Sequence, residues 1–210
     1  MDDGFEIILG PSTGPQIPEY PERAGRVYRK VKLRLGKPGA PVRVILEFKA
    51  LKEMMDHCGS ERKLEIGGML AGKTFRQGDR FVAETRLAIP ARQGLSKGTS
   101  FTFSHDAWGE INEVLAAAEG ASSLLGWYHT HPGFEVFFSG HDRFVHQSFF
   151  TQPWQYAIVV DPVGWKIGLF ISVGTRVELF DAFEAVCAEE DSDELDQYLQ
   201  TWFPPPSSTD

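Results

Sequence analysis

The chain has 210 residues, a length that suits one compact domain with extensions. Its formal net charge of −8 argues against nucleic-acid binding, and its apolar runs are too short to span a bilayer. The acidic N-terminus lacks the basic start of a signal peptide, and the two cysteines have no metal-type spacing. These features predict a cytoplasmic protein without a disulfide framework or a membrane partner. They leave its oligomeric state open.

The order of the predicted elements indicates an α+β domain. Residues 1–25, which are rich in proline and glycine, are expected to form a flexible lead, and residues 183–210 an acidic, proline-ending tail. The domain between them, residues 26–182, mixes strands with helices. Alternating or continuous apolar patterns predict strands at 27–35, 42–48, 64–75, 80–91, 99–104, 123–131, 154–162, 166–172 and 176–183. Amphipathic patterns predict helices at 50–59, 105–120 and 139–150.

Two histidines mark the end of the strand predicted at 123–131. Side chains at positions i and i+2 of a strand point to the same side, so His129 and His131 can present two imidazoles to one point. Such a pair suits Zn²⁺, although a His-x-His pair alone is often an ordinary surface or core feature. Pro132 ends the strand directly after the second histidine.

The next helix is predicted to begin with a capping box. Ser139 and Asp142 stand in the Ser-x-x-acid pattern, which places Asp142 in the first turn, near the end of the histidine strand. The carboxylate can then be a third ligand. Two histidines and one carboxylate leave one tetrahedral position open for water, as in a catalytic zinc site. A Ser-x-x-Asp pattern alone is usually only a helix cap.

Three segments together resemble a known motif. Glu65-x-Gly67-Gly68, then His129-Thr130-His131-Pro132, then Ser139-x-x-Asp142 look like the JAMM motif of JAB/MPN-domain zinc metalloproteases. The resemblance covers about residues 42–182. It departs in Thr130, where serine is common, and in an unusually apolar loop at 133–138. The short segment between the helix at 141 and the strand at 156 resembles compact prokaryotic members.

The resemblance implies a fold, a cofactor and roles for the site residues. The fold is a curved mixed β-sheet flanked by helices in an α-β-α sandwich of the MPN, or cytidine-deaminase-like, type. One catalytic Zn²⁺ would be held by His129, His131 and Asp142, with Glu65 as general acid/base and Ser139 stabilising the oxyanion. The two glycines after Glu65 allow its strand to lie close to the metal strand. The apolar loop is expected to touch the substrate through Phe134, Phe137 and Phe138.

The implied activity is cleavage after the C-terminal glycine of a ubiquitin-like protein, which removes that protein from conjugates. The partners would be the ubiquitin-like protein or its conjugates, together with E1-like and E2-like enzymes of the same operon. A role in antiviral defence is one expectation from such an operon. Processing of a ubiquitin-like or sulfur-carrier precursor uses the same chemistry and stays open. An inactive MPN scaffold is the alternative of a different class, although such relatives typically lose a ligand or the glutamate.

Overall fold

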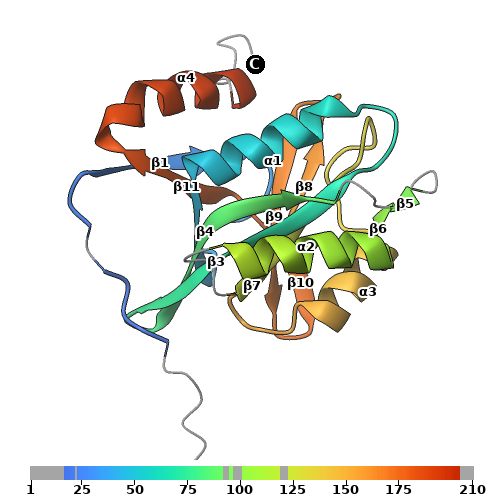
Figure 1. Cartoon of the computed structure of the whole chain (residues 1–210), viewed down its shortest axis with the longest axis horizontal. Helices are drawn as coiled ribbons and strands as arrows, with labels where there is room; N and C mark the ends of the chain where they lie inside the picture. The colour runs from blue at the N-terminus through green and yellow to red at the C-terminus, as the bar shows by residue number, and fades with distance from the viewer. Residues whose placement is uncertain (1–16, 22, 92–94, 97–100, 119–122, 204–210) are drawn as a thin grey trace, which may run out of the picture.

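The computed structural model describes residues 17–21, 23–91, 95–96, 101–118 and 123–203. These residues form a nine-stranded mixed sheet with helices on both faces, so the expected α+β class with a curved mixed sheet is confirmed (Figure 1). The sheet order is β1-β11-β2-β4-β3-β7-β8-β9-β10, and β5 and β6 form a separate pair. The strands are β1 (Arg26–Lys32), β2 (Val42–Glu47), β3 (Gly67–Gln77), β4 (Arg80–Pro90), β5 (Leu95–Ser96), β6 (Phe101–Thr102), β7 (Ser123–Thr130), β8 (Tyr156–Asp161), β9 (Lys166–Val173), β10 (Arg176–Phe180) and β11 (Ala182–Ala188).

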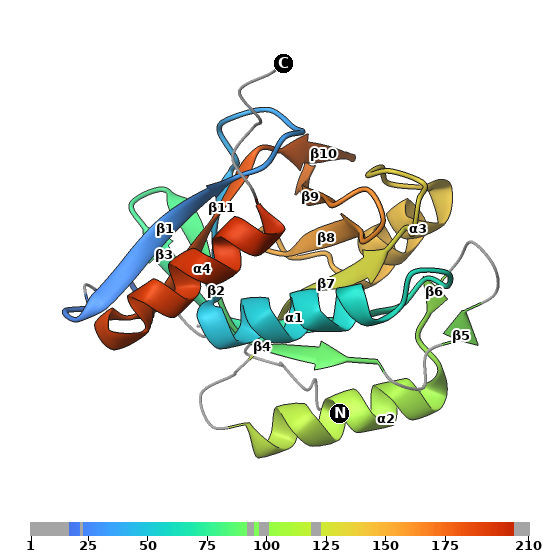
Figure 2. The ribbon, with the colours of Figure 1, turned by 90° about the horizontal axis from the view of Figure 1, so that it is seen from above.

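Two pairs of helices cover opposite faces of the sheet, as Figures 1 and 2 show. The helices are α1 (Phe48–Ser60), α2 (His105–Ala117), α3 (Gly140–Phe149) and α4 (Ser192–Trp202), with a short 3-10 helix η1 (Glu189–Asp191) before α4. α1 and α4 bury Leu51 and Leu195 in one core, while α2 contributes Ile111 to the core on the other face. None of the helices in the described ranges is long and apolar enough to cross a membrane.

Strand β7 divides its side chains between the two cores. Trp127 lies in the core under α2 and α3, whereas its neighbour Tyr128 lies in the core under α1. Because side chains alternate along a strand, His129 shares the face of Trp127 and points toward α3. The alternation therefore puts the histidines on the same side of the sheet as the helix that begins at Gly140.

Gly68 allows β3 to lie close against its neighbours. A Cβ atom at this position would stand 2.3 Å from the Ile89 carbonyl oxygen and 2.6 Å from the Tyr128 hydroxyl. Both distances are well below van der Waals contact, so a larger side chain requires the strands to move. The close approach expected from the paired glycines is present, and it brings the beginning of β3 opposite the end of β7.

Residues 183–203 contain most of β11, η1 and α4, where the sequence analysis expected part of an acidic tail at 183–210. β11 lies between β1 and β2, with seven residue pairs to β1 and three to β2. α4 then buries Leu195 and Trp202. The acidic run at 189–196 favoured a tail over a helix. The apolar residues of α4 nevertheless recur every three or four positions between the charged residues, which is typical of an amphipathic helix. The sheet therefore extends beyond the expected boundary, and residues 204–210 lie outside the described part.

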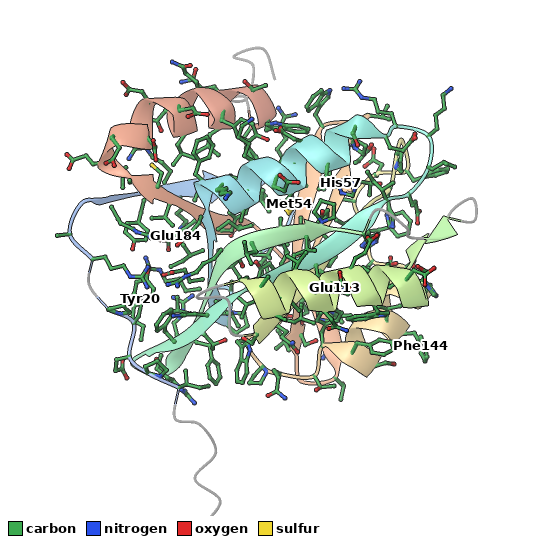
Figure 3. The ribbon with its side chains drawn as sticks, viewed as in Figure 1. Tyr20, Met54, His57, Glu113, Phe144 and Glu184 are labelled. Atoms are coloured by element: carbon green, nitrogen blue, oxygen red, sulfur yellow. The ribbon has the colours of Figure 1, made fainter. Side chains whose placement is uncertain are left out.

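Part of the expected N-terminal lead also contacts the sheet. The Tyr20 N–H donates to the Arg76 carbonyl oxygen over 2.6 Å, and the Arg76 N–H donates to the Pro18 carbonyl oxygen over 2.8 Å. Residues 18–20 therefore run along β3, and Figure 3 shows Tyr20 near Glu184 at this side of the molecule. Residues 1–16 lie outside the described ranges.

Candidate metal centre

His129 and His131 come from the end of β7 and lie in the interior. Their exposed fractions are 1% and 2%, and their Nε2 atoms are 3.1 Å apart. The His131 N–H donates to the Val160 carbonyl oxygen over 2.8 Å, so pairing with β8 continues past the last residue of β7. The i and i+2 spacing thus brings both imidazoles to one point, as the sequence predicted.

Asp142 reaches the same point from the first turn of α3. Its Oδ1 is 3.3 Å from His129 Nε2, and its Oδ2 is 3.6 Å from His131 Nε2. The predicted capping box with Ser139 is present in both directions. The helix cap therefore aims the carboxylate at the two imidazoles.

Glu65 completes the group from the other side. The residue is 5% exposed, and its Oε1 lies 3.8 Å from His131 Nε2. The sequence predicted a strand from residue 64, but β3 begins at Gly67, so Glu65 lies in the connection just before it. This connection is held in place by Thr130, whose Oγ1 accepts a hydrogen bond from the Ile66 N–H over 3.0 Å.

Burial and mutual contacts shift the pKa values of His129 and Asp142. Burial lowers the pKa of His129, although the neighbouring Asp142 acts in the opposite direction. Burial alone would raise the pKa of Asp142, but its contacts with His129, His131 and Ser139 hold that pKa well below the usual range. Asp142 is therefore ionised near neutral pH, and its negative charge lies beside the nitrogen of a buried imidazole.

The donor atoms fit a divalent metal ion. One ligand atom from each of His129, His131 and Asp142 lies within 4.8 Å of the other two, and all three residues are buried. Two imidazole nitrogens and a carboxylate oxygen form one of the donor sets found in catalytic zinc sites. The two imidazole Nε2 atoms, 3.1 Å apart, either share a proton or turn their lone pairs toward each other. A cation bound between them and the Asp142 carboxylate would remove the repulsion between the lone pairs.

Aromatic rings pack tightly around the histidines. Trp127 stacks on His129 with a centroid distance of 4.5 Å, and its Nε1 donates to His146 Nδ1 over 3.2 Å. Phe138 packs inward on Trp127 and Phe170, with centroid distances of 6.1 and 4.7 Å. Phe138, which the sequence analysis expected to touch the substrate, is partly buried by these rings.

The other two phenylalanines of the loop are exposed. Phe134 and Phe137 are 57% and 47% exposed, and the Phe137 ring lies 4.5 Å from the His131 ring. Phe137 therefore lies beside the second candidate ligand. Asp161, which the sequence analysis did not single out, lies behind this loop, where its carboxylate accepts hydrogen bonds from the Gly133 and Glu135 N–H groups. No local sequence signal indicates these contacts, because 26 to 28 residues separate the partners.

The protein is an α+β domain with a candidate metal site. Its mixed sheet is flanked by helices, and two histidines at the end of β7 meet an aspartate from the first turn of α3. Residues 40–152 match the family described as JAB1/Mov34/MPN/PAD-1 ubiquitin protease. The match covers more than half of the chain, and the chain belongs to this family.

Several curated proteins are similar over the same part of the chain. COP9 signalosome complex subunit 5 of Dictyostelium discoideum is 31% identical over 116 residues, which are 54% of this chain and 34% of that protein. Subunit 5a of Arabidopsis thaliana is 29% identical over 123 residues, 57% of this chain and 33% of that protein. The NAD(+) hydrolase TcpA of a Theionarchaea archaeon is 27% identical over 126 residues, 60% of this chain and 36% of that protein. The matched segments thus span about a third of each relative.

Among solved structures, the solution structure of protein DSY2949 from Desulfitobacterium hafniense is similar, with 21% identity and a TM-score of 0.48. That similarity covers 65% of this chain and 88% of the other.

Proposed function

We propose that this chain is a zinc-dependent isopeptidase that cleaves after the C-terminal glycine of a ubiquitin-like protein and so removes it from conjugates. The observation that carries the proposal is the buried convergence of His129, His131 and Asp142 within 4.8 Å, with the Glu65 carboxylate 3.8 Å from His131. The family's description as ubiquitin proteases, and the COP9 signalosome subunits among the relatives, favour this substrate class.

The roles of the side chains follow from their positions. His129, His131 and Asp142 would hold Zn²⁺, whose Lewis acidity lowers the pKa of water and polarises a carbonyl. Glu65 then acts as general base: its carboxylate takes the proton of the attacking water and later passes it to the leaving amine. Burial keeps this carboxylate away from bulk solvent, so the transferred proton stays within the site.

Ser139 has a proton available for the oxyanion. Its Oγ accepts the Asp142 N–H over 3.1 Å, which uses a lone pair and leaves the hydroxyl hydrogen free to point elsewhere. The side chain can therefore cap α3 and donate to the developing oxyanion at the same time. Both roles need a hydroxyl group, and neither excludes the other.

Two alternatives use the same residues. Processing of a ubiquitin-like or sulfur-carrier precursor breaks a linear peptide bond by the same chemistry. An inactive scaffold of this family would not need Glu65 buried beside the ligands, and its presence favours an enzyme. NAD⁺ hydrolysis, which appears in the name of the archaeal relative, requires a different substrate and provides a useful comparison.

The test uses the purified 210-residue chain loaded with zinc. We would offer two substrates, a ubiquitin-like protein ending in Gly-Gly joined to a lysine side chain and the same protein in a linear fusion, with NAD⁺ as a third assay. Cleavage of the isopeptide-linked substrate that stops with a chelator and returns with zinc supports deconjugation. Faster cleavage of the linear fusion would favour precursor processing.

Glu65→Gln is the decisive variant. We expect it to lower turnover by about 10² to 10⁴-fold while zinc remains bound, because only the proton acceptor is lost. Glu113→Gln, on the exposed side of α2 (Figure 3), is the matched control and should leave turnover unchanged. Wild-type turnover in Glu65→Gln, or cleavage that persists in chelator, would contradict the mechanism.

A further inference from the structure

A groove of about 460 Å³ lies at the end of the sheet where β3 and β4 join. Strands β1, β11 and β2 contribute most of its lining, and residues 38–40 and the two residues that flank the β3–β4 turn contribute the rest. The charged residues of the lining are Lys30, Lys32, Arg43, Arg80, Asp181 and Glu184. Cations thus outnumber carboxylates in the groove, although the formal net charge of the chain is −8.

The lysines of the groove come from strand β1. Val31 is 4% exposed and lies in the core under α1 and α4, so alternation puts Lys30 and Lys32 on the other side of the strand, where both are exposed. Arg29 of the same strand is held by the Asp196 carboxylate of α4 over 2.7 Å. Across the described ranges, no carboxylate forms an ion pair with either lysine. Their ammonium groups are therefore available to a ligand.

Arg43 adds a guanidinium group whose orientation is fixed. Its Nε and Nη2 donate to the two carboxylate oxygens of Glu184 over 2.8 and 2.7 Å, and its Cζ lies 5.2 and 5.6 Å from the ring centres of Tyr20 and Tyr28. Glu184 stands opposite Lys30 in the pairing of β11 with β1. Because Arg43 binds both carboxylate oxygens, this glutamate offsets the charge of Arg43 rather than that of the lysine.

Arg80 supplies the remaining cation of the lining. It is the first residue of β4, and its Nη2 donates to the Ala40 carbonyl oxygen over 2.8 Å, which ties the guanidinium to the segment at 38–40. This contact uses one of the five N–H donors of the group. In the part of the chain that the structure describes, no carboxylate pairs with Arg80, so its other donors can bind a ligand carboxylate.

The groove is far from the candidate metal centre. Gln77, which lines the groove, and Gly67, which lies two residues after Glu65, are the two ends of β3, and a strand of this length spans about 33 Å. Figure 3 shows Glu184 at one side of the molecule and Phe144, two residues beyond Asp142, at the other. A ligand in the groove therefore does not occupy the metal centre.

We propose that this groove binds a short acidic segment of a partner protein, whose carboxylates pair with Lys30, Lys32 and Arg80. The occupant follows from charge complementarity between carboxylates and the unpaired cations of the lining. A nucleic acid fits less well, because its continuous row of phosphates would extend beyond the groove over a chain of net charge −8. The groove would give the chain a point of attachment to a partner that is separate from the metal centre.

Protection of an edge strand is the competing explanation for the lysines. β1 is an outer strand of the sheet, and lysines on such strands hinder pairing with a second molecule. Protection predicts that neutral substitutions promote self-association, and it predicts no preference for acidic peptides. A binding role predicts that the same substitutions weaken a complex with an acidic peptide while the oligomeric state stays as in the wild type.

The test measures fluorescence anisotropy on the zinc-loaded 210-residue chain. The probes are two labelled peptides, Glu-Ser-Glu-Ser-Glu-Ser and Gln-Ser-Gln-Ser-Gln-Ser, which differ only in charge. Alternate side chains of an extended peptide share a face, as Lys30 and Lys32 do. We expect the acidic probe to bind more tightly, and its binding to weaken as salt is added. The double variant Lys30→Gln/Lys32→Gln should weaken this binding by about threefold or more, and Arg80→Gln by about twofold.

The matched control is Lys49→Gln/Lys63→Gln, which changes the net charge equally at two exposed lysines outside the groove. It should bind the acidic probe as the wild type does. Thermal unfolding and light scattering check the fold and the oligomeric state of each variant. The proposal is wrong if both double variants weaken binding equally, if the neutral probe binds as tightly as the acidic one, or if only self-association changes. Tighter binding of labelled duplex DNA through the same lysines would overturn it in favour of a nucleic acid.

Amide chemical shifts locate the bound probe. The acidic probe should move the N–H signals of Lys30, Lys32 and Gln77 and leave those of Gly67 and His129 in place. Shifts confined to the metal centre would show that the probe binds there, and the groove proposal would fall. None of these measurements needs cleavage of a substrate. Failure of the groove therefore leaves the proposed function intact, and failure of the isopeptidase assays leaves the groove intact.

Discussion

The Ser139 N–H donates to Asp142 Oδ2 over 2.7 Å, and the Asp142 N–H donates back to Ser139 Oγ over 3.1 Å. The same Oδ2 lies 3.6 Å from His131 Nε2. The first turn of α3 and the metal-facing carboxylate are therefore positioned by one pair of hydrogen bonds. The hydrogen bonds that begin α3 thus also place the third candidate ligand.

Replacing Asp142 with asparagine separates these two roles. An amide oxygen can still accept the Ser139 N–H, so stability should fall by no more than about 1 kcal/mol. Zinc affinity should fall by more than about 100-fold, because loss of an outer-shell partner alone costs 10- to 100-fold and here a charged ligand is lost. Competition with a chromophoric chelator measures the affinity. His141→Asn, the exposed neighbour, is the control, and equal affinities for the two variants would contradict the ligand assignment.

Ser139 offers a test of the oxyanion role. Ser139→Ala removes both the cap and the free hydroxyl hydrogen, so kcat should fall by about 10² or more and stability by about 1 kcal/mol. Ser139→Thr keeps the hydroxyl and should restore most of both. Steady-state kinetics and urea unfolding measure the two effects separately. An alanine variant with lower stability and unchanged kcat would show that Ser139 only caps the helix.

Thr130 should influence turnover without touching the metal. Thr130→Val leaves the partly buried Ile66 N–H without its acceptor, which costs about 1 kcal/mol and loosens the connection that carries Glu65. We expect lower stability and a severalfold lower kcat with normal zinc content. Thr85→Val is the matched control, since Thr85 is equally buried and bonds the Tyr156 hydroxyl in another part of the sheet. It should lose stability only; a similar fall in kcat in both variants would rule out a specific effect of Thr130.

The sequence predicted the parts of the site that depend on local geometry. His129 and His131 follow from strand periodicity, and the Ser139–Asp142 pair follows from capping chemistry. Glu65 is 64 residues before His129, and only the pairing of β3 with β7 brings it near. No local pattern indicates that pairing, so Glu65 was named through the family resemblance.

The parts that the sequence analysis missed depend on tertiary contacts. In the sequence, Asp161 is only the last residue of an apolar strand. Its carboxylate accepts hydrogen bonds from the loop at 133–135 because that loop folds back on it. The acidic run before residue 196 favoured a solvated tail, whereas the apolar residues between these charges pack α4 onto the core. In both cases, the deciding partner lies far away in the sequence.

His146 should make the protein less stable in mild acid. Burial lowers its pKa to about 4, and its Nδ1 accepts the Trp127 indole N–H, so the folded state keeps the ring neutral. Between the ordinary histidine pKa of about 6.5 and a pH of about 4, the unfolded chain binds a proton that the folded chain does not. Stability is therefore fully present above pH 6.5 and falls as the pH drops toward 4, by about 3 kcal/mol at most.

Urea unfolding at several pH values between 4 and 8, in chelator to remove metal linkage, measures this loss. His146→Phe keeps an aromatic ring against Phe150 and cannot take up a proton, so its stability should depend less on pH than that of the wild type. His129, whose pKa is also lowered, contributes in the same direction in both proteins, so the difference between them isolates His146. His141→Gln, at an exposed position of α3, should retain the wild-type slope. If His146→Phe retains it as well, the buried His146 ring is not the origin of the acid sensitivity.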